Sequence, residues 1–326
     1  MSLLPCEEGV LVESRRDLLA AMLSILIPTH NTDCLRLVAD LHQQGEELQA
    51  QFGESQFRFE ILLIDDASTD KQALSRNELA EAFDHVRYIQ HTANEGRVAT
   101  RNHLLRLATY PYLLMVDADA EVCQSDFLLN YWTRRDEAQI IVGGLTTPTQ
   151  MQLGCELRHR YETAAASSRS LQQRQAHPYE QFTAFNLFAE TSLVQQIGFD
   201  PRCAEYGHED TLLGIELQNR GCRILHIDNP LVHTGINSNE SFLANTEAAL
   251  RNLARIGSPL TDHSPLAQLY ARLSLWQLAP LLRLGHTLLA PILKCQLRSA
   301  RPSLRLFKLY KLLYFAHIGQ NPSNPR

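Results

Sequence analysis

Residues 112–119 read YLLMVDAD, an apolar run that ends in two aspartates, Asp117 and Asp119, with Ala118 between them. A short apolar run bounded by polar residues is typical of a buried strand. The pattern therefore predicts a strand over 112–116 and places two carboxylates just beyond its carboxyl end.

Two earlier runs, residues 23–28 (LSILIP) and 57–64 (FRFEILLI), repeat this design. The polar residues that follow them are Thr29, His30 and Asn31 after the first run and Asp65 and Asp66 after the second. Helical patterns over residues 35–48, 71–83 and 97–108 and a strand near 85–90 fill the intervals. Strands that alternate with helices predict an α/β fold with a mostly parallel sheet covered by helices on both faces. Ligands of such sheets bind beyond the carboxyl ends of the strands.

The second half of the chain has a less regular pattern. We expect strands at 140–142, 181–188 and 223–227, a helix after Thr191 and a helix over 209–220 that Gly221 terminates. Residues 146–181 are polar and show weak strand signals, so their fold is not predicted. Tyr161, Glu162, Arg169 and Arg174 in this segment could belong to a mobile lid or an acceptor site, but the preferred interpretation is a surface helix with exposed charges.

The 326 residues are 44% hydrophobic and 20% charged, which is typical of globular proteins and argues against a disordered, collagenous or wholly membrane-embedded chain. The net charge of −6 averages two unlike parts. Residues 1–262 hold all 36 acidic residues against 21 basic ones, a balance of −15, whereas residues 263–326 hold nine Lys and Arg and no acid. We call residues 263–326 the C-terminal tail. An acidic body with a basic tail suggests a soluble domain tethered to an anionic partner.

The tail is rich in leucine as well as basic residues. Prolines at 265, 280, 291 and 302 are expected to divide it into short helices, because proline is tolerated only in the first turn of a helix. Since no run of about 18 uncharged apolar residues occurs, we expect basic amphipathic helices lying in a membrane interface. A nucleic acid is not expected as a partner, because the body is acidic and the tail lacks an aromatic stacking platform.

Seven scattered cysteines without a CxxC pair, interpreted as buried thiols, fit a reducing compartment. The N-terminus lacks the basic and apolar regions of a secretory signal. We therefore expect a cytoplasmic protein, held peripherally on the inner face of the cell membrane by its tail.

The strand ends and one helix start carry candidate binding chemistry. Asp117 and Asp119 can offer hard oxygen ligands to Mg²⁺ or Mn²⁺, and Asp65 and Asp66 can hydrogen-bond a ribose or a base. Residues 94–102 open a helix whose backbone amides and two arginines favour a phosphate group. The alternatives are an exposed acidic turn at 117–119, Asx caps at Asp66 and Asn94, and a solvated basic face at Arg97 and Arg101.

The ordered series IPTHN, IDDAS, NEGRVATRN, VDADA and YGHED, from about residue 23 to residue 255, resembles the inverting family 2 glycosyltransferases of bacterial type, which have the GT-A fold. The resemblance implies a GT-A glycosyltransferase domain. Together with the change in charge after residue 262, it predicts a lead segment at 1–22, this domain at 23–262 and the basic helical tail at 263–326.

The resemblance also implies roles for individual residues. Asp117 and Asp119 would hold Mn²⁺ or Mg²⁺ on the diphosphate of a nucleotide sugar, and His233 would complete the metal or diphosphate site. Asp210, with Glu209 beside it, would supply the general base, although first-turn acids of helices are also common for structural reasons. The candidate nucleotide-sugar-binding residues are Pro28, Thr29, Asn31, Asp65, Asp66, Asn94, Gly96, Arg97, Arg101, Asp117 and Ala118.

These residues suit a single displacement, in which one carboxylate takes the acceptor proton while cations stabilise the leaving nucleoside diphosphate. The expected function is metal-dependent transfer of a sugar from a nucleotide donor to a lipid-linked or polysaccharide acceptor in cell-surface glycan synthesis. The alternatives are an inactive nucleotide-binding membrane scaffold and a HAD-like phosphatase, which also places a DxD after a strand. The position of the triplet, after the fourth strand, counts against the phosphatase.

Overall fold

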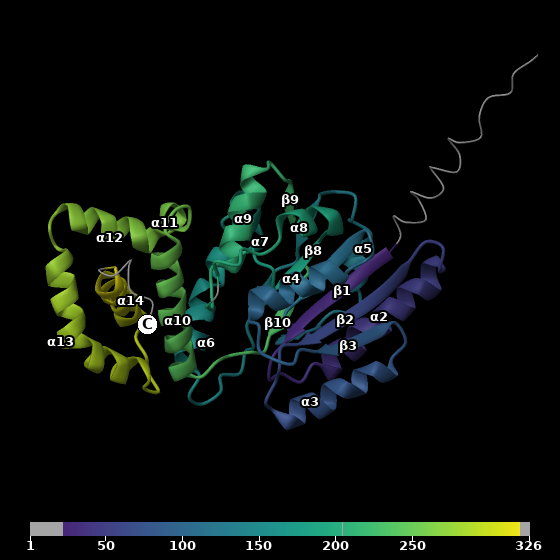
Figure 1. The fold of residues 1–326 in the computed structure, drawn as a ribbon, viewed down its shortest axis with the longest axis horizontal. Helices are drawn as coiled ribbons and strands as arrows, with labels where there is room; N and C mark the ends of the chain where they lie inside the picture. Colours follow the sequence, from purple (N-terminus) through teal and green to yellow (C-terminus); the bar gives the residue numbers. More distant parts are fainter. Residues whose placement is uncertain (1–21, 204, 320–326) are drawn as a thin grey trace, which may run out of the picture. The chain divides into compact units, whose positions relative to one another are not determined.

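The computed structural model describes residues 22–203 and 205–319 (Figure 1). By their internal contacts the described residues form two compact units. Unit 1 holds residues 22–145, Thr183–Gly198 and Cys222–Leu231, and unit 2 holds Thr146–Phe182, Phe199–Gly221 and the chain from Val232 onward. The predicted division at 22/23 and 262/263 follows the family resemblance and the change in charge along the chain, and it stays a prediction. Nearly all of the predicted lead segment lies outside the described residues.

Unit 1 is built on a seven-stranded sheet with the strand order β3–β2–β1–β4–β8–β6–β9. Its strands are β1 (Met22–Thr29), β2 (Arg58–Asp65), β3 (Val86–Gln90), β4 (Tyr112–Val116), β6 (Ile140–Val142), β8 (Asn186–Glu190) and β9 (Ile224–His226). Only β8 runs antiparallel to its neighbours, β4 and β6, while the other pairs are parallel. The predicted mostly parallel α/β sheet is confirmed.

Helices cover this sheet because its strands are apolar on both faces. They are α2 (Leu35–Phe52), α3 (Lys71–Glu78), the 3₁₀ helix η1 (Leu79–Ala82), α4 (Arg97–Leu107), α5 (Phe127–Trp132) and α8 (Thr191–Ile197). Ile25 of β1 and Ile61 of β2 pack in one core with Leu41 of α2 and Leu128 of α5, all of them fully buried. Helix α4 contacts β1, β2 and α8. Three short strands, β5 (Ala120–Glu121), β10 (Leu231–His233) and β7 (Leu145–Thr146), form a second sheet in that order.

Unit 2 is helical. Its elements are α6 (Glu156–Ala165), the 3₁₀ helix η2 (Ser167–Arg169), α7 (Leu171–Ala176), α9 (Glu209–Asn219), α10 (Asn239–Ile256), α11 (Leu260–His263), α12 (Pro265–Leu275), α13 (Ala279–Leu297) and α14 (Leu304–Ile318). The segment at 146–181, whose fold was not predicted, thus contributes two α-helices and a 3₁₀ helix. Helix α14 contacts α6, α10, α12 and α13 (Figure 1). Its Phe307 and Tyr310 lie in a core with Leu157 and Phe242.

The structure corrects three expectations from the sequence. Pro291 lies inside α13 instead of dividing it. The expected strand at 181–188 begins only at Asn186. Cys123 and Cys295 are exposed, whereas Cys34, Cys155, Cys203 and Cys222 are buried as expected and Cys6 lies outside the described residues.

The helical tail is confirmed, but α14 uses its apolar face inside unit 2. We expect Phe307→Ala to lower the free energy of unfolding by about 3–5 kcal/mol, because it leaves a cavity at a side chain that is 1% exposed. The control Leu309→Ala, on the exposed side of the same helix, should change it by less than about 0.5 kcal/mol. Urea unfolding followed by circular dichroism measures both values. Equal stability of the two variants would contradict the assignment of α14 to the core.

Candidate functional site

Strand register brings the polar residues of unit 1 to one edge of the sheet. In the parallel pairs, Thr29 of β1 lies opposite Asp65 of β2, and Asp65 lies opposite Gln90 of β3. Strand β4 runs parallel to β1 on its other side. The residues that follow β1 to β4 therefore share the carboxyl edge of the sheet, and we call this group the strand-end site.

Asn31 joins the turn after β1 to the turn after β2. It adopts a left-handed conformation with φ of 53°, which asparagine tolerates better than most residues. Its side-chain oxygen accepts hydrogen bonds from the backbone amides of Thr69, at 2.7 Å, and Asp70, at 2.9 Å. Pro28 and Thr29, the last residues of β1, lie just before this turn. The side-chain oxygen of Asn31 thus joins the loop after β1 to the loop after β2.

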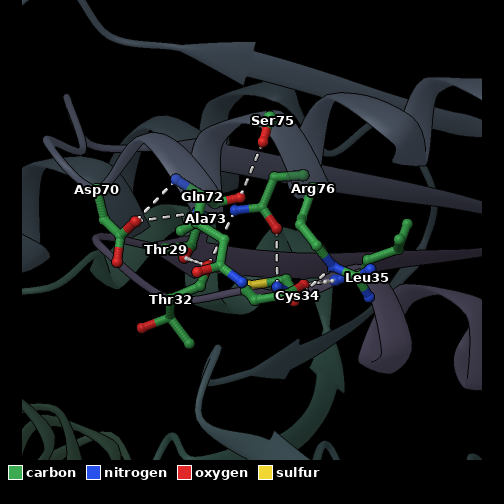
Figure 2. A network of polar contacts seen from close by, with 11 residues as sticks. Thr29, Thr32, Cys34, Leu35, Asp70, Gln72, Ala73, Ser75 and Arg76 are labelled. Atoms are coloured by element: carbon green, nitrogen blue, oxygen red, sulfur yellow. Dashed lines mark hydrogen bonds and ion pairs between the residues drawn. The ribbon is translucent and has the colours of Figure 1, made fainter.

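Figure 2 shows how the loop between β1 and α2 is fixed against α3. The buried side chain of Asn77 accepts from the amide of Cys34 at 2.8 Å and donates to the carbonyl of Thr32 at 2.9 Å. The side chain of Asp70 caps α3 by accepting from the amides of Gln72 and Ala73. The loop that carries Asn31 is therefore fixed against α3.

Asp65 is completely buried at the end of β2. One carboxylate oxygen accepts from the amide of Ser68 at 2.7 Å, and the other lies 3.3 Å from the hydroxyl of Tyr88. Burial, and then the charge of Asp65, raises the pKa of Tyr88, so this hydroxyl keeps its proton and donates a hydrogen bond to the carboxylate. Asp65 thereby fixes the turn that presents Asp66.

Asp66 holds the turn between β3 and α4. Its carboxylate accepts from the backbone amides of Glu95 and Gly96, both at 2.8 Å, and lies 3.0 Å from Nδ1 of His91. Its carbonyl accepts from the side chain of Asn94 at 3.1 Å. Burial by itself would raise the pKa of Asp66, but these hydrogen bonds outweigh it and lower the pKa. The predicted contact with a nucleoside stays a prediction, and Asp66 has this structural role in addition.

Two histidines extend the contact of Asp66, and the sequence reasoning did not identify either. Because a carboxylate only accepts, Nδ1 of His91 donates to Asp66. Nε2 of His91 lies 2.9 Å from Nδ1 of His103 on α4, and the two rings stack. Burial, followed by the proximity of His91, lowers the pKa of His103. The position of His91, directly after β3, is the sequence signal that could have identified it.

The start of α4 approaches the acidic turn after β4. Arg101 donates to Asp117 at 2.6 Å, and Arg97 lies 3.5 Å from the other oxygen of the same carboxylate. The alternative of a solvated basic face is wrong for Arg101, which is fully buried, while Arg97 is 43% exposed. Gly96 caps α4 with φ of 89°, a conformation that favours glycine. Two cations and the amides of a helix start thus lie beside Asp117.

The acidic turn offers oxygen ligands of the kind that Mg²⁺ and Mn²⁺ prefer. Asp117 and Asp119 are half-buried on either side of Ala118, and the amide of Ala120 donates to the carbonyl of Asp117 at 3.1 Å. No group of three or more His, Cys, Asp or Glu in the described residues is arranged to hold a metal ion. The donor chemistry of the two carboxylates fits a hard divalent cation whose remaining ligands come from a bound phosphate or water.

In unit 2, Glu209 and Asp210 form the first turn of α9. Gly207 and His208, which precede them, both have positive φ, 97° and 74°. A Cβ on Gly207 would lie 2.8 Å from Cβ of Ala249 on α10, so this position requires glycine. Glu209 is 5% exposed and Asp210 is half-buried.

Asn252 of α10 holds the approach to this acidic pair. Its buried side-chain amide donates to the carbonyls of Glu205, at 2.8 Å, Gly207, at 3.2 Å, and Tyr206, at 3.3 Å. Nothing in the sequence pattern pointed to this asparagine, because the three carbonyls lie more than 40 residues away from it. The loop that turns into α9 is therefore anchored to a long helix.

His233, the third predicted metal-site residue, contacts an acid that had been interpreted as exposed. Nδ1 of His233 lies 3.1 Å from Glu162, whose side chain is 1% exposed and also pairs with Arg158. The interpretation of Glu162 and Arg174 as exposed charges is wrong, since both residues are buried. The metal role of His233 stays a prediction.

Residues 24–192, about half of the chain, match the family described as Glycosyl transferase family 2. The chain belongs to this family. Its membership agrees with the resemblance inferred from the sequence motifs and replaces the HAD-like phosphatase as an explanation of the DxD.

Curated relatives align with this family 2 glycosyltransferase over short stretches. The uncharacterized glycosyltransferase YibD of Escherichia coli is 32% identical over 97 residues, 28% of this chain and 28% of the relative. The poly(ribitol-phosphate) beta-glucosyltransferase of Bacillus spizizenii is 28% identical over 131 residues, 38% of this chain and 19% of the relative. The chain thus covers less than a third of the length of either relative.

A solved structure supports the GT-A fold. The mannosyltransferase PcManGT from Pyrobaculum calidifontis, in complex with GDP-Man and Mn²⁺, has a TM-score of 0.51 at 15% identity, over 90% of this chain and 85% of that one. This likeness concerns the fold alone.

The Asp66–His91 contact generates a prediction for this glycosyltransferase. We expect His91→Ala to weaken nucleoside diphosphate binding about tenfold, because Asp66 then loses a charge-assisted partner and its hold on the β3–α4 turn loosens. His91→Asn, whose amide can donate to Asp66, should recover part of the affinity. Titration calorimetry with the tightest-binding of UDP, GDP, dTDP and CDP measures the effect. The control is His85→Ala, at a histidine whose side chain is 44% exposed; the same loss in both variants would refute the assignment.

The Glu162 cluster predicts a dependence of stability on pH. Burial would raise the pKa of Glu162, but the hydrogen bond from His233 and the charge of Arg158 lower it from 4.5 to about 2. The resulting stabilisation, on the order of 3 kcal/mol, is present above pH 4.5 and is lost as the pH falls towards 2.

The wild type should therefore exceed Glu162→Gln in free energy of unfolding most above pH 4.5, and the difference should shrink towards pH 2. Urea unfolding at a series of pH values measures this difference. Glu240→Gln, at a side chain that is 73% exposed, serves as the control. A difference between wild type and Glu162→Gln that stays constant over this range contradicts the coupling.

Proposed function

We propose that this glycosyltransferase moves a sugar from a nucleotide-sugar donor to a hydroxyl of a lipid-linked or polysaccharide acceptor, with inversion at the anomeric carbon and with a divalent metal ion. The observation that carries the proposal is the strand-end site. There, the acidic turn after β4 lies beside two arginines and the amino end of α4. Anionic and cationic groups thus meet at the carboxyl edge of the sheet, the edge at which open α/β sheets bind ligands.

The donor is bound, in this proposal, by charge and by backbone amides. The amino end of α4 and the exposed side of Arg97 attract the diphosphate. Arg101, buried and paired with Asp117, fixes the orientation of that carboxylate. The loops after β1 and β2, which Asn31 and Asp66 hold, provide the walls against the nucleoside.

Asp117 and Asp119 would hold the metal ion, Mn²⁺ or Mg²⁺. When bound, such an ion neutralises charge that develops on the departing nucleoside diphosphate. The pairing of Asp117 with Arg101 orients this carboxylate in the absence of the ion. The Mn²⁺ named in the PcManGT complex supports a metal ion of this kind.

Asp210 would act as the general base and take the proton of the acceptor hydroxyl. It lies in the first turn of α9, where the helix dipole stabilises its negative charge. Glu209 is buried beside it, and Asn252 anchors the preceding loop, so the position of Asp210 is well defined. Glu209 and Asn252 are positioning residues in this proposal.

The acceptor class rests on the family, on a relative and on the tail. The relative from Bacillus spizizenii is named for glucosyl transfer to poly(ribitol-phosphate). The basic tail suits an anionic membrane that carries lipid-linked acceptors, with the enzyme on the cytoplasmic face. None of the helices in the described residues is both long and apolar enough to cross a membrane.

Two substitutions test the assignment of the metal site and the base. Asp210→Asn should lower kcat by about a hundredfold or more while the affinity for the nucleoside diphosphate stays within about twofold. Asp119→Ala should instead abolish the difference in affinity measured with Mn²⁺ and with EDTA. Calorimetry and transfer of radiolabelled sugar measure the two effects, and Asp84→Asn, at an exposed aspartate, serves as the control. Normal turnover by Asp210→Asn would refute the base, and unchanged metal dependence in Asp119→Ala would refute the metal site.

A further inference from the structure

Large apolar side chains gather on the surface of unit 2 at α12 and α13. The group comprises Leu275, Trp276, Leu281, Leu284, Leu288 and Ile292, which we call the leucine face. Trp276 is 75% exposed and Leu288 is 62% exposed. On α13 the members follow one another at intervals of three or four residues, so they lie along one side of the helix. Soluble monomers rarely expose a contiguous apolar surface of this kind without using it.

The leucine face is not needed for folding, because α13 packs into unit 2 through other residues. Ala290, Leu293 and Leu297 are buried in the core that α14 shares. Gly285 lies so close to α14 that a Cβ there would be 3.2 Å from Leu313. Helix α13 is therefore apolar on two sides, of which one forms the core and the other faces solvent.

The net charge of the tail that carries the leucine face indicates the kind of partner. The tail contains no acidic residue, and Arg272, Arg301, Arg305 and Lys308 are exposed on it. A second copy of the chain would bring an equally basic surface, which opposes self-association through this face. An anionic lipid bilayer supplies both an apolar phase for the leucines and phosphate groups for the cations.

We propose that the leucine face of α12 and α13 inserts into the interface of an anionic bilayer, with α13 lying along the surface and Trp276 as its anchor in the headgroup region. The inference rests on the membrane contact in the proposed function. It assigns that contact to the leucine face instead of the whole tail. Helix α14 belongs to the protein core, and its packing against α13 holds the leucine face in place. Removal of the tail is for this reason an unsuitable test, because it would also remove α14 from the core.

The two tryptophans of the chain make a direct measurement possible. Trp132 is 3% exposed, whereas Trp276 is highly exposed. Phosphatidylglycerol vesicles should therefore shift the emission of the full-length protein to the blue through Trp276 alone, and Trp276→Phe should abolish the shift. Neutral phosphatidylcholine vesicles should bind clearly less protein in flotation assays, because they offer no anionic surface. Anionic vesicles in 0.5 M salt should also bind less, because salt shortens the electrostatic screening length below the value of about 8 Å at physiological ionic strength.

The decisive variant is Leu284→Gln with Leu288→Gln, at two exposed positions whose change leaves the core intact. It should lower the partition coefficient on phosphatidylglycerol vesicles by at least about tenfold. The matched control is Leu79→Gln with Leu153→Gln, at leucines that are 56% and 93% exposed elsewhere on the surface, and it should bind like the wild type. Equal loss in both double variants, or binding that depends on neither, would overturn the proposal.

Two further outcomes would also overturn it. One is the absence of any vesicle binding by the wild type. The other is a concentration-dependent dimer, detected by light scattering, that the Leu284→Gln and Leu288→Gln changes disrupt, since the face would then join two copies. Nucleoside diphosphate affinity is measured in the same samples without vesicles. If the wild type binds no nucleoside diphosphate, the proposed function is contradicted. The vesicle measurements would still decide the role of the leucine face.

Discussion

The carboxylate of Asp66 is the contact on which the strand-end site depends. It closes a bridge between the end of β2 and the turn before α4 by accepting two backbone amides that lie about thirty residues away in the chain. Since α4 starts at this turn, the bridge determines where its first amides and Arg97 lie. Buried beneath it, Asp65 fixes the turn on the β2 side, and His91 reinforces the carboxylate from β3. The loops of the strand-end site are thus joined to one another by hydrogen bonds that do not require a ligand.

The electrostatics of the same site follow from one pairing. Arg101 is completely buried, and a buried guanidinium is costly unless an anion compensates it. Asp117 supplies that anion at 2.6 Å. A nucleotide diphosphate and a divalent cation would add charges of both signs to a site that already contains both, so donor binding need not create a large net charge. The balance between Arg97, Arg101 and the acidic turn is therefore central to the proposed chemistry.

Two helices of the tail with similar sequences differ in their burial. Helices α13 and α14 are both leucine-rich and basic, and the sequence predicted the same interfacial role for each. Contacts with α6, α10 and α12 bury one side of α14, including Phe307 and Tyr310. Within the part of the chain that the structure describes, the leucine face of α13 stays exposed. Only the packing of helices around α14 separates a core element from an exposed one. The position of Pro291 inside α13 was not predicted from the sequence either, because packing against neighbouring helices stabilises α13 as one element.

By itself, the sequence determined the alternation of strands and helices, the mostly parallel sheet and the family. The reason is local: the runs at 23–28, 57–64 and 112–116 are apolar enough to be buried strands in any context, and the polar residues after them fall at the carboxyl ends. It also identified the acidic turn and the arginines of α4 as candidates. The tertiary structure decided the partners of these residues. His91 and His103, Glu162 with His233, and Asn252 under the α9 loop are contacts between distant segments, and burial of charge at Arg101 and Glu162 depends on which elements cover them. Local patterns do not encode such contacts, because the hydrogen bonds form only after the sheet and helices have packed.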